Sequence, residues 1–130
     1  MKLRKFISAC LFCLYIGAVA FLCFARPENI PQLSETWLGF PADKVAHFAM
    51  FLPFPFLAYL VLEPQKKRRW WWKAIVLLAV AAAGAVLARW TEDIQARLTY
   101  RTSDIRDFLA DMYGMAAGLL VTITYMLFRR

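Results

Sequence analysis

One uninterrupted apolar run near the C-terminus reads Phe108-Leu-Ala-Asp-Met-Tyr-Gly-Met-Ala-Ala-Gly-Leu-Leu-Val-Thr-Ile-Thr-Tyr-Met-Leu-Phe128 and contains a single acid, Asp111. A helix needs about 20 residues to cross the hydrocarbon core of a bilayer, which is ~30 Å thick. This run therefore predicts a membrane-spanning helix. An ionisable side chain at membrane depth is energetically costly, which makes Asp111 a candidate functional residue.

Three further apolar runs precede this one. The four runs are Phe6–Phe24, Val45–Leu62, Trp70–Ala88 and Phe108–Phe128, each of 18 to 21 residues. Hydrophobic residues make up 62% of the 130-residue chain, whereas soluble domains are roughly 45–50% apolar. We predict a single all-α domain, residues 1–130, built as a polytopic membrane bundle of four helices at about 6–24, 45–62, 70–90 and 106–128.

The first run follows a basic segment, Met1–Lys5, a pattern that secretory signal peptides share. Its apolar part has 19 residues, longer than the roughly 7–15 of a signal peptide, so we expect it to be retained as a helix. The three cysteines, Cys10, Cys13 and Cys23, all lie in this run. We interpret them as small residues buried in helix packing and expect no disulfide.

Charged residues are distributed unevenly between the connections. If the N-terminus is cytoplasmic, the inner segments (1–5, 63–73 and 129–130) carry a net charge of +9, and the outer segments (25–44 and 89–111) carry −2. An excess of Lys and Arg marks cytoplasmic loops, and the basic stretch Lys66–Arg69 runs directly into Trp70–Trp72, residues suited to the membrane interface. We predict that both termini are cytoplasmic. The net charge of +7 then reflects membrane topology, and we expect no binding of nucleic acid.

Prolines interrupt the second run and the segment before it. The segment Arg26–Ala42 contains Pro27, Pro31 and Pro41 together with a glycine, which predicts an irregular outer loop. Two more prolines, at positions 53 and 55, lie near the middle of the second run. Because each removes a backbone donor, we expect a kink there.

The last run has a stripe of acidic and small residues. A spacing of 3, 4, 3 and 4 places Asp104, Asp107, Asp111, Gly114 and Gly118 on one helical face. A Gly-x-x-x-Gly pair lets a neighbouring helix approach closely, so we assign the two glycines to helix packing. The three aspartates then point into the bundle and away from lipid.

Two other runs bring polar residues to the same end of the bundle. Glu92 and Gln95 continue a stripe of small residues on the third run, and Lys44 and His47 share a face of the second run. Glu92 lies near a helix C-terminus, where the helix dipole disfavours an anion, so we expect it to have a cationic partner. The sequence thus predicts one outward-facing polar mouth built by three helices.

Part of this mouth has a purely structural interpretation. Ser103 is the residue type of a helix N-cap, and Asp104 and Asp107 would then complement the dipole of the first turn. Arg101 could simply pair with these two acids. Capping does not explain Asp111, which lies two turns into its helix.

The polar residues form two ordered motifs. The first is Asp43-Lys44-x-x-His47-Phe48, and the second comprises Glu92, Gln95, Arg101, Asp104, Asp107, Gly114 and Gly118 at fixed spacing. Together they resemble the VanZ-like family of small bacterial membrane proteins, and the resemblance runs from Asp43 to Gly118. Members of that family usually carry asparagine where this chain has Asp111. The aspartate adds a negative charge and removes an amide donor.

The resemblance implies a multi-pass protein of the bacterial cytoplasmic (inner) membrane with its polar site on the extracytoplasmic side. The founding member of the family confers low-level resistance to teicoplanin, so the resemblance implies a link with glycopeptide tolerance. The candidate ligand-binding residues are Lys44, His47, Glu92, Gln95, Arg101, Asp104, Asp107 and Asp111.

Three functions fit this arrangement. The first is binding of a lipid or cell-envelope component, with Lys44 and Arg101 contacting a phosphate or carboxylate. The second is an intramembrane hydrolase or transferase acting on a lipid-linked substrate, with the catalytic candidates His47, Glu92, Asp104 and Asp107. The third is a proton-coupled carrier with a relay of His47 and Asp111. We predict no cofactor, and a divalent cation held by His47 and the acids is kept as an alternative for the enzyme.

Overall fold

The computed structural model describes residues 2–29, 34–62 and 69–129. Its helices are α1 (Lys2–Phe24), η1 (Pro27–Asn29, a 3-10 helix), α2 (Ala42–Phe51), α3 (Phe54–Leu62), α4 (Trp70–Gln95) and α5 (Ile105–Phe128). Four segments are long and apolar enough to cross a membrane, namely α1, the α2–α3 pair, α4 and α5. The predicted all-α bundle of four spans is therefore confirmed.

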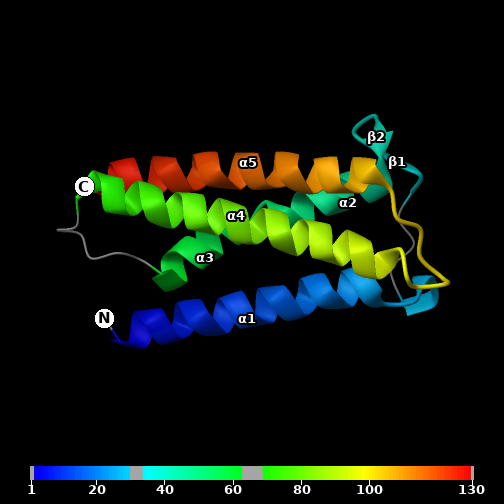
Figure 1. Ribbon diagram of the computed structural model, residues 1–130, viewed down its shortest axis with the longest axis horizontal. Coiled ribbons are helices and arrows are strands. Elements are labelled where there is room, and N and C mark those ends of the chain that lie inside the picture. The colour runs from blue at the N-terminus through cyan, green and yellow to red at the C-terminus, as the bar shows by residue number, and fades with distance from the viewer. Residues whose placement is uncertain (1, 30–33, 63–68, 130) are drawn as a thin grey trace.

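The helices lie side by side along the long axis of the molecule (Figure 1). The start of α1 and the end of α5 lie at one end, and the connection between α4 and α5 lies at the other. An even number of crossings requires this arrangement. Apart from Arg69, the basic stretch expected at the first end lies outside the described residues.

The predicted outer loop contains a small β-hairpin. Strand β1 (Thr36–Trp37) pairs antiparallel with β2 (Phe40–Pro41), and Trp37 lies opposite Phe40. The two turn residues, Leu38 and Gly39, have φ angles of 52° and 80°, the left-handed conformation that tight two-residue hairpins require. The hairpin leads directly into α2 at the same end as the α4–α5 connection (Figure 1).

The second span is broken between α2 and α3, as its prolines predict. Helix α2 ends at Phe51, and α3 begins at Phe54. The Tyr15 hydroxyl of α1 donates a hydrogen bond to the Met50 carbonyl in the last turn of α2. A neighbouring helix thus supplies a donor near the point where the proline interrupts the backbone ladder, as a break inside a membrane requires.

Apolar packing is concentrated around α3. Phe54 and Ala58 of α3 form a buried cluster with Val80 of α4 and Met115 of α5. The Phe12 ring of α1 packs on this cluster, with its centroid 5.8 Å from that of Phe54. Large apolar side chains such as Leu14, Leu78 and Leu120 are exposed on the outside of the bundle. Such a surface suits lipid, because no water is needed to solvate it.

Two expectations from the sequence were wrong in detail. Helix α4 continues past position 90 to Gln95, because the backbone ladder continues and Ala96 N–H still donates to the Glu92 carbonyl. The three cysteines are not all buried. Cys23 is buried, but Cys10 and Cys13 are exposed, because they lie away from the face of α1 that packs on the bundle.

Candidate functional site

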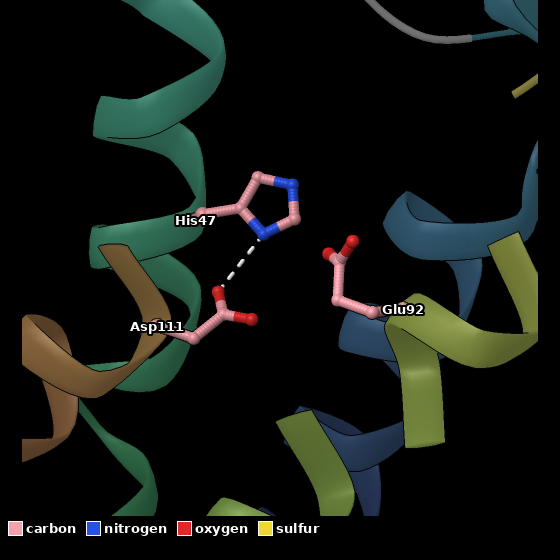
Figure 2. Close-up of side chains that lie close together, drawn as sticks. All are labelled: His47, Glu92 and Asp111. Carbon is pink, nitrogen blue, oxygen red and sulfur yellow. Dashed lines mark hydrogen bonds and ion pairs between the residues drawn. The ribbon is translucent and has the colours of Figure 1, made fainter. Parts of the chain in front are cut away.

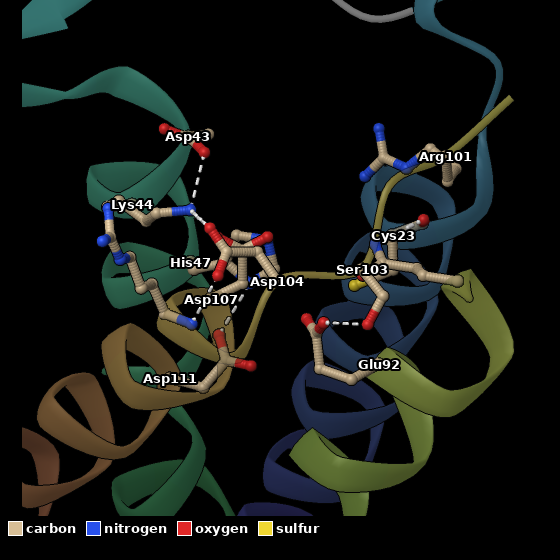
Figure 3. Close-up of polar contacts among 12 residues, drawn as sticks. Cys23, Asp43, Lys44, His47, Glu92, Arg101, Ser103, Asp104, Asp107 and Asp111 are labelled. Atoms are coloured by element: carbon tan, nitrogen blue, oxygen red, sulfur yellow. Dashed lines mark hydrogen bonds and ion pairs between the residues drawn. The ribbon is translucent and has the colours of Figure 1, made fainter.

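The three aspartates of α5 lie on one face and become progressively more buried along the helix. The exposed fraction of the side chain falls from 42% for Asp104 to 10% for Asp107 and 0% for Asp111. All three lie beside α2, which faces this stripe of α5 (Figure 3). The polar cluster therefore starts at the end of the bundle and continues into its interior.

Asp104, and not Ser103, caps helix α5. The Asp104 carboxylate accepts a hydrogen bond of 2.9 Å from the Arg106 backbone N–H. This bond and the contact with Lys44 hold the pKa of the Asp104 carboxyl below its usual range. Ser103 instead donates to Glu92 Oε2 at 3.2 Å, because the extended backbone before α5 turns its hydroxyl toward α4.

Lys44 of α2 is surrounded by acids. Its ammonium contacts Asp43 at 2.9 Å and Asp104 at 3.1 Å, and it also pairs with Asp107. One positive charge is thus shared among three carboxylates. Lys44 neutralises part of the acidic stripe and holds α2 against the start of α5.

His47 lies one turn further along α2 and reaches Asp111. Its Nδ1 atom is 2.9 Å from Asp111 Oδ1, and its Nε2 atom is 3.6 Å from Asp107 Oδ2. The imidazole is thus placed between two aspartates of α5. All three residues are buried, so the contacts are removed from solvent.

Glu92 approaches this pair from α4. Its carboxyl group faces the His47 ring from the side opposite α2 (Figure 2). His47, Glu92 and Asp111 each offer one potential ligand atom, and these three atoms lie within 4.8 Å of one another. The sequence predicted a cationic partner for Glu92. His47 lies where this partner would be, and it is cationic only when protonated.

The other two predicted ligand-binding residues face α1. Gln95 donates from Nε2 to the Cys23 carbonyl at 2.9 Å, and Arg101 donates to the Leu22 carbonyl at 3.3 Å. Both bonds reach the last turn of α1, where the carbonyls lack helical partners. Gln95 and Arg101 thus tie α1 to the end of α4 and to the segment that follows it.

Two glycines set the distance between α5 and the second span. A Cβ atom at Gly114 would collide with the Phe48 carbonyl oxygen, and one at Gly118 would collide with the Leu52 carbonyl oxygen. The backbones are therefore in direct contact at these two points. This close approach places His47 at hydrogen-bonding distance from Asp111.

Sequence reasoning missed some partners in this region. Ser103 was interpreted as a cap, and Asp43 was not assigned to the site, although it pairs with Lys44. A signal for Asp43 was present, because it immediately precedes Lys44 in the first motif. No local pattern indicates that Ser103 reaches Glu92, because Glu92 belongs to α4 and Ser103 lies in the non-helical segment before α5.

Comparison with known protein families identifies the group to which this chain is related. The family model described as VanZ/LLP1 matches residues 11–129. The chain belongs to the VanZ/LLP1 family. The match includes every polar residue described above, so the predicted resemblance is confirmed. No curated protein and no solved structure matches the chain.

Proposed function

We propose that this VanZ/LLP1 protein binds the polar group of a lipid or cell-envelope component in the cluster formed by α2, α4 and α5. The observation that carries the proposal is the concentration of ionisable side chains inside an apolar bundle. Lys44, His47, Glu92, Asp107 and Asp111 all lie within membrane-spanning segments. Buried charges of this kind are costly and mark functional sites.

The proposed ligand enters from the end of the bundle that carries the hairpin. Asp104 and Asp43 are the most exposed members of the cluster at this end, and Asp111 is completely buried. A ligand with hydroxyl or amine groups fits the outer part, because carboxylates accept hydrogen bonds from such donors. Lys44 is already shared among acids, so its role is to orient them.

We assign this end of the bundle to the extracytoplasmic face of the bacterial cytoplasmic membrane. Among the described residues, the segments at this end (25–29, 34–44 and 89–111) carry a net charge of −2, whereas those at the end with the start of α1 and the end of α5 (2–5, 69–73 and 129) carry +6. Cytoplasmic segments of membrane proteins are enriched in Lys and Arg. A site on this side meets lipids of the outer leaflet and cell-envelope precursors, which connects the proposal with glycopeptide tolerance.

Native mass spectrometry of the protein purified in mild detergent tests this proposal. We expect a lipid or envelope molecule to co-purify with the wild type, and the Asp107→Asn variant to lose it. Asp93→Asn is the matched control, because Asp93 is exposed and pairs with Arg89 on its own helix. Equal ligand occupancy in wild type and Asp107→Asn would refute the proposal.

The same variants can be tested in cells. If the site contributes to glycopeptide tolerance, expression of the wild type raises the teicoplanin concentration that inhibits growth. The Glu92→Gln and Asp107→Asn variants are expected to abolish this increase, and Asp93→Asn is expected to retain it. Full function of both site variants at equal expression would exclude the polar cluster from the phenotype.

An intramembrane hydrolase or transferase is a second candidate function, favoured by the bond between His47 and Asp111. A carboxylate at 2.9 Å from Nδ1 holds the imidazole in one orientation, as in enzymes that use histidine as a general base. A lipid-linked substrate would place its reacting group near Nε2. A His47→Ala variant that still binds the ligand but no longer converts it would distinguish this enzyme from a binding protein.

A further inference from the structure

We propose that His47, Glu92 and Asp111 form a binding site for one divalent transition-metal ion at the deepest point of the polar cluster. This inference deepens the proposed function, because the ion would act on the ligand bound there. The binding of the ion itself is a separate property and can be measured without any ligand. Each of the three residues comes from a different helix, namely α2, α4 and α5.

The three side chains converge on a common point. Their ligand atoms lie within 4.8 Å of one another, and all three residues are buried. Figure 2 shows the Glu92 carboxyl group on one side and the pair of His47 and Asp111 on the other. Metal–ligand bonds to nitrogen and oxygen are about 2.0–2.2 Å long, so small side-chain rotations bring all three atoms into contact with one ion.

Two carboxylate oxygens in this group have no hydrogen-bond partner in the part of the chain that the structure describes. They are Glu92 Oε1 and Asp111 Oδ2, and both are fully buried. Buried polar atoms are almost always satisfied, and an exception calls for an explanation, of which a bound ion is one. A divalent cation between the two carboxylates would satisfy both oxygens at once.

The charge balance favours the same solution. Lys44 is shared among Asp43, Asp104 and Asp107, which leaves Glu92 and Asp111 with His47. Even a protonated His47 would compensate only one of these two buried carboxylates. A divalent ion compensates both and leaves the imidazole neutral, the form in which histidine binds metals.

The ligand types indicate the class of ion. Imidazole suits transition metals such as Zn²⁺, and carboxylates also suit Mn²⁺, whereas Ca²⁺ and Mg²⁺ prefer oxygen ligands alone. Three protein ligands leave at least one coordination position open, as in catalytic metal sites. An oxygen atom of the envelope ligand or a water molecule can take this position.

Neighbouring residues are placed to support the ligands. Asp107 Oδ2 lies 3.6 Å from His47 Nε2, close to the position from which a carboxylate holds the proton on the second ring nitrogen. Ser103 donates to Glu92 Oε2, which fixes one carboxylate oxygen and leaves the other free. Metal-binding histidines and carboxylates characteristically have such outer partners.

Asp111 is both a proposed metal ligand and the position at which this chain departs from the motif of the sequence resemblance. The sequence resemblance implies asparagine at this position, and the aspartate found here supplies the negative charge that an ion requires. The Asp111→Asn variant keeps the size of the side chain and removes its negative charge. It is therefore expected to fold and to lose the metal site selectively.

The test is a metal titration of the purified protein. The protein carries no polyhistidine tag and has the Cys10→Ser and Cys13→Ser substitutions, because exposed thiols bind Zn²⁺. After treatment with EDTA, it is titrated with Zn²⁺ and Mn²⁺ by calorimetry. We expect one ion per chain, an affinity at least about 10-fold lower in Asp111→Asn, and no change in Asp93→Asn.

Spectroscopy of bound Mn²⁺ gives a readout that does not depend on variants. His47 is the only histidine in the sequence, so a coupling between the Mn²⁺ electron spin and an imidazole nitrogen identifies the site. Absence of stoichiometric binding, or bound Mn²⁺ without this coupling, would refute the proposal. An unchanged affinity in both Asp111→Asn and Glu92→Gln, with both variants folded by circular dichroism, would refute it as well.

These results separate the metal site from the proposed function. If one ion binds and no envelope component co-purifies with the holoprotein, the metal site stands and the binding function fails. If an envelope component co-purifies with metal-free protein and no ion binds, the binding function stands and the metal site fails.

Discussion

Around α3 the bundle is packed with apolar side chains, whereas around α2 it holds charged ones, although α4 and α5 line both regions. Val80 and Met115 belong to the first region, and Glu92 and Asp111 belong to the second. In the apolar region packing alone explains the residues. In the polar region two carboxylate oxygens lack partners within the described residues. Burying such groups lowers the stability of the fold, so a structural role does not explain why these residues are there.

The glycines of the two regions also differ in the atoms that they face. Gly84, in the apolar region, faces the side chains of Met115 and Phe54, whereas Gly114 and Gly118 face backbone carbonyls of the second span. A methionine side chain can rearrange, whereas a backbone carbonyl cannot move without shifting its chain segment. The polar region is therefore held by rigid contacts, as a binding site requires.

The largest effect is expected from Gly114→Ala, which tests this rigidity. The added Cβ atom would collide with the Phe48 carbonyl, and overpacking of this kind costs up to about 3 kcal/mol. Gly84→Ala is expected to cost less because Met115 can move, and Gly17→Ala is a neutral control because its Cβ atom would meet open space. Unfolding free energies in detergent measure these differences. Equal losses of stability in the three variants would contradict the expected difference in rigidity between the two regions.

A smaller loss of stability is expected from Phe54→Ala in the apolar region. Phe54 packs on Phe12 and on the buried cluster. Removing its ring leaves a cavity, which is expected to lower the free energy of unfolding by about 2 kcal/mol, because packing is the main stabilising contribution in lipid. The affinity for Mn²⁺ should be unchanged in this variant. A parallel loss of metal affinity would show that the two regions are not independent.

Glu92→Gln is expected to change stability in the opposite direction. The substitution replaces a buried acid that lacks a full set of partners by a neutral amide, and a buried charge costs more than a buried amide, so we expect the ligand-free protein to gain about 1 kcal/mol of stability. The amide oxygen can still accept the hydrogen bond from Ser103. The same variant should lose ligand and metal binding. Thermal unfolding without metal provides the measurement, with Asp93→Asn as the matched control, and a clear destabilisation would contradict this expectation.

The smallest effect concerns Asp104, at the exposed end of the cluster. Its pKa is lowered by the Arg106 N–H and by Lys44, so its carboxylate stabilises the fold above the ordinary aspartate pKa of about 4. This contribution disappears as the pH falls through the lowered pKa. The difference in unfolding temperature between wild type and Asp104→Asn should therefore be present at neutral pH and vanish in acid. A difference in unfolding temperature that persists at the lowest pH would contradict a stabilising role of the Asp104 carboxylate.

The fold could be predicted largely from the sequence because its determinants are local. Apolar run lengths gave the four spans, and Pro53 and Pro55 gave the break between α2 and α3. The end of α4 was placed too early because Glu92 and Gln95 are polar, although the helix continues through both. The β-hairpin was not predicted, because its pairing depends on only two short strands.

The candidate site could be predicted as a set of residues but not as a set of contacts. Helical spacing correctly placed Asp107, Asp111, Gly114 and Gly118 on a buried face. It could not indicate that Lys44 pairs with the acids of α5 while Arg101 bonds to the end of α1. Those contacts depend on how the helices are rotated and shifted relative to one another.

By itself, the sequence determined the membrane spans and the face of each helix that turns inward, because both follow from residue order and helical periodicity. Only the tertiary structure decided that Asp111 meets His47 and that Glu92 completes the group. The physical reason is the contact of Gly114 with the Phe48 carbonyl, which fixes the separation of α2 and α5. A metal site needs positions accurate to a fraction of an ångström, and helix packing supplies this accuracy.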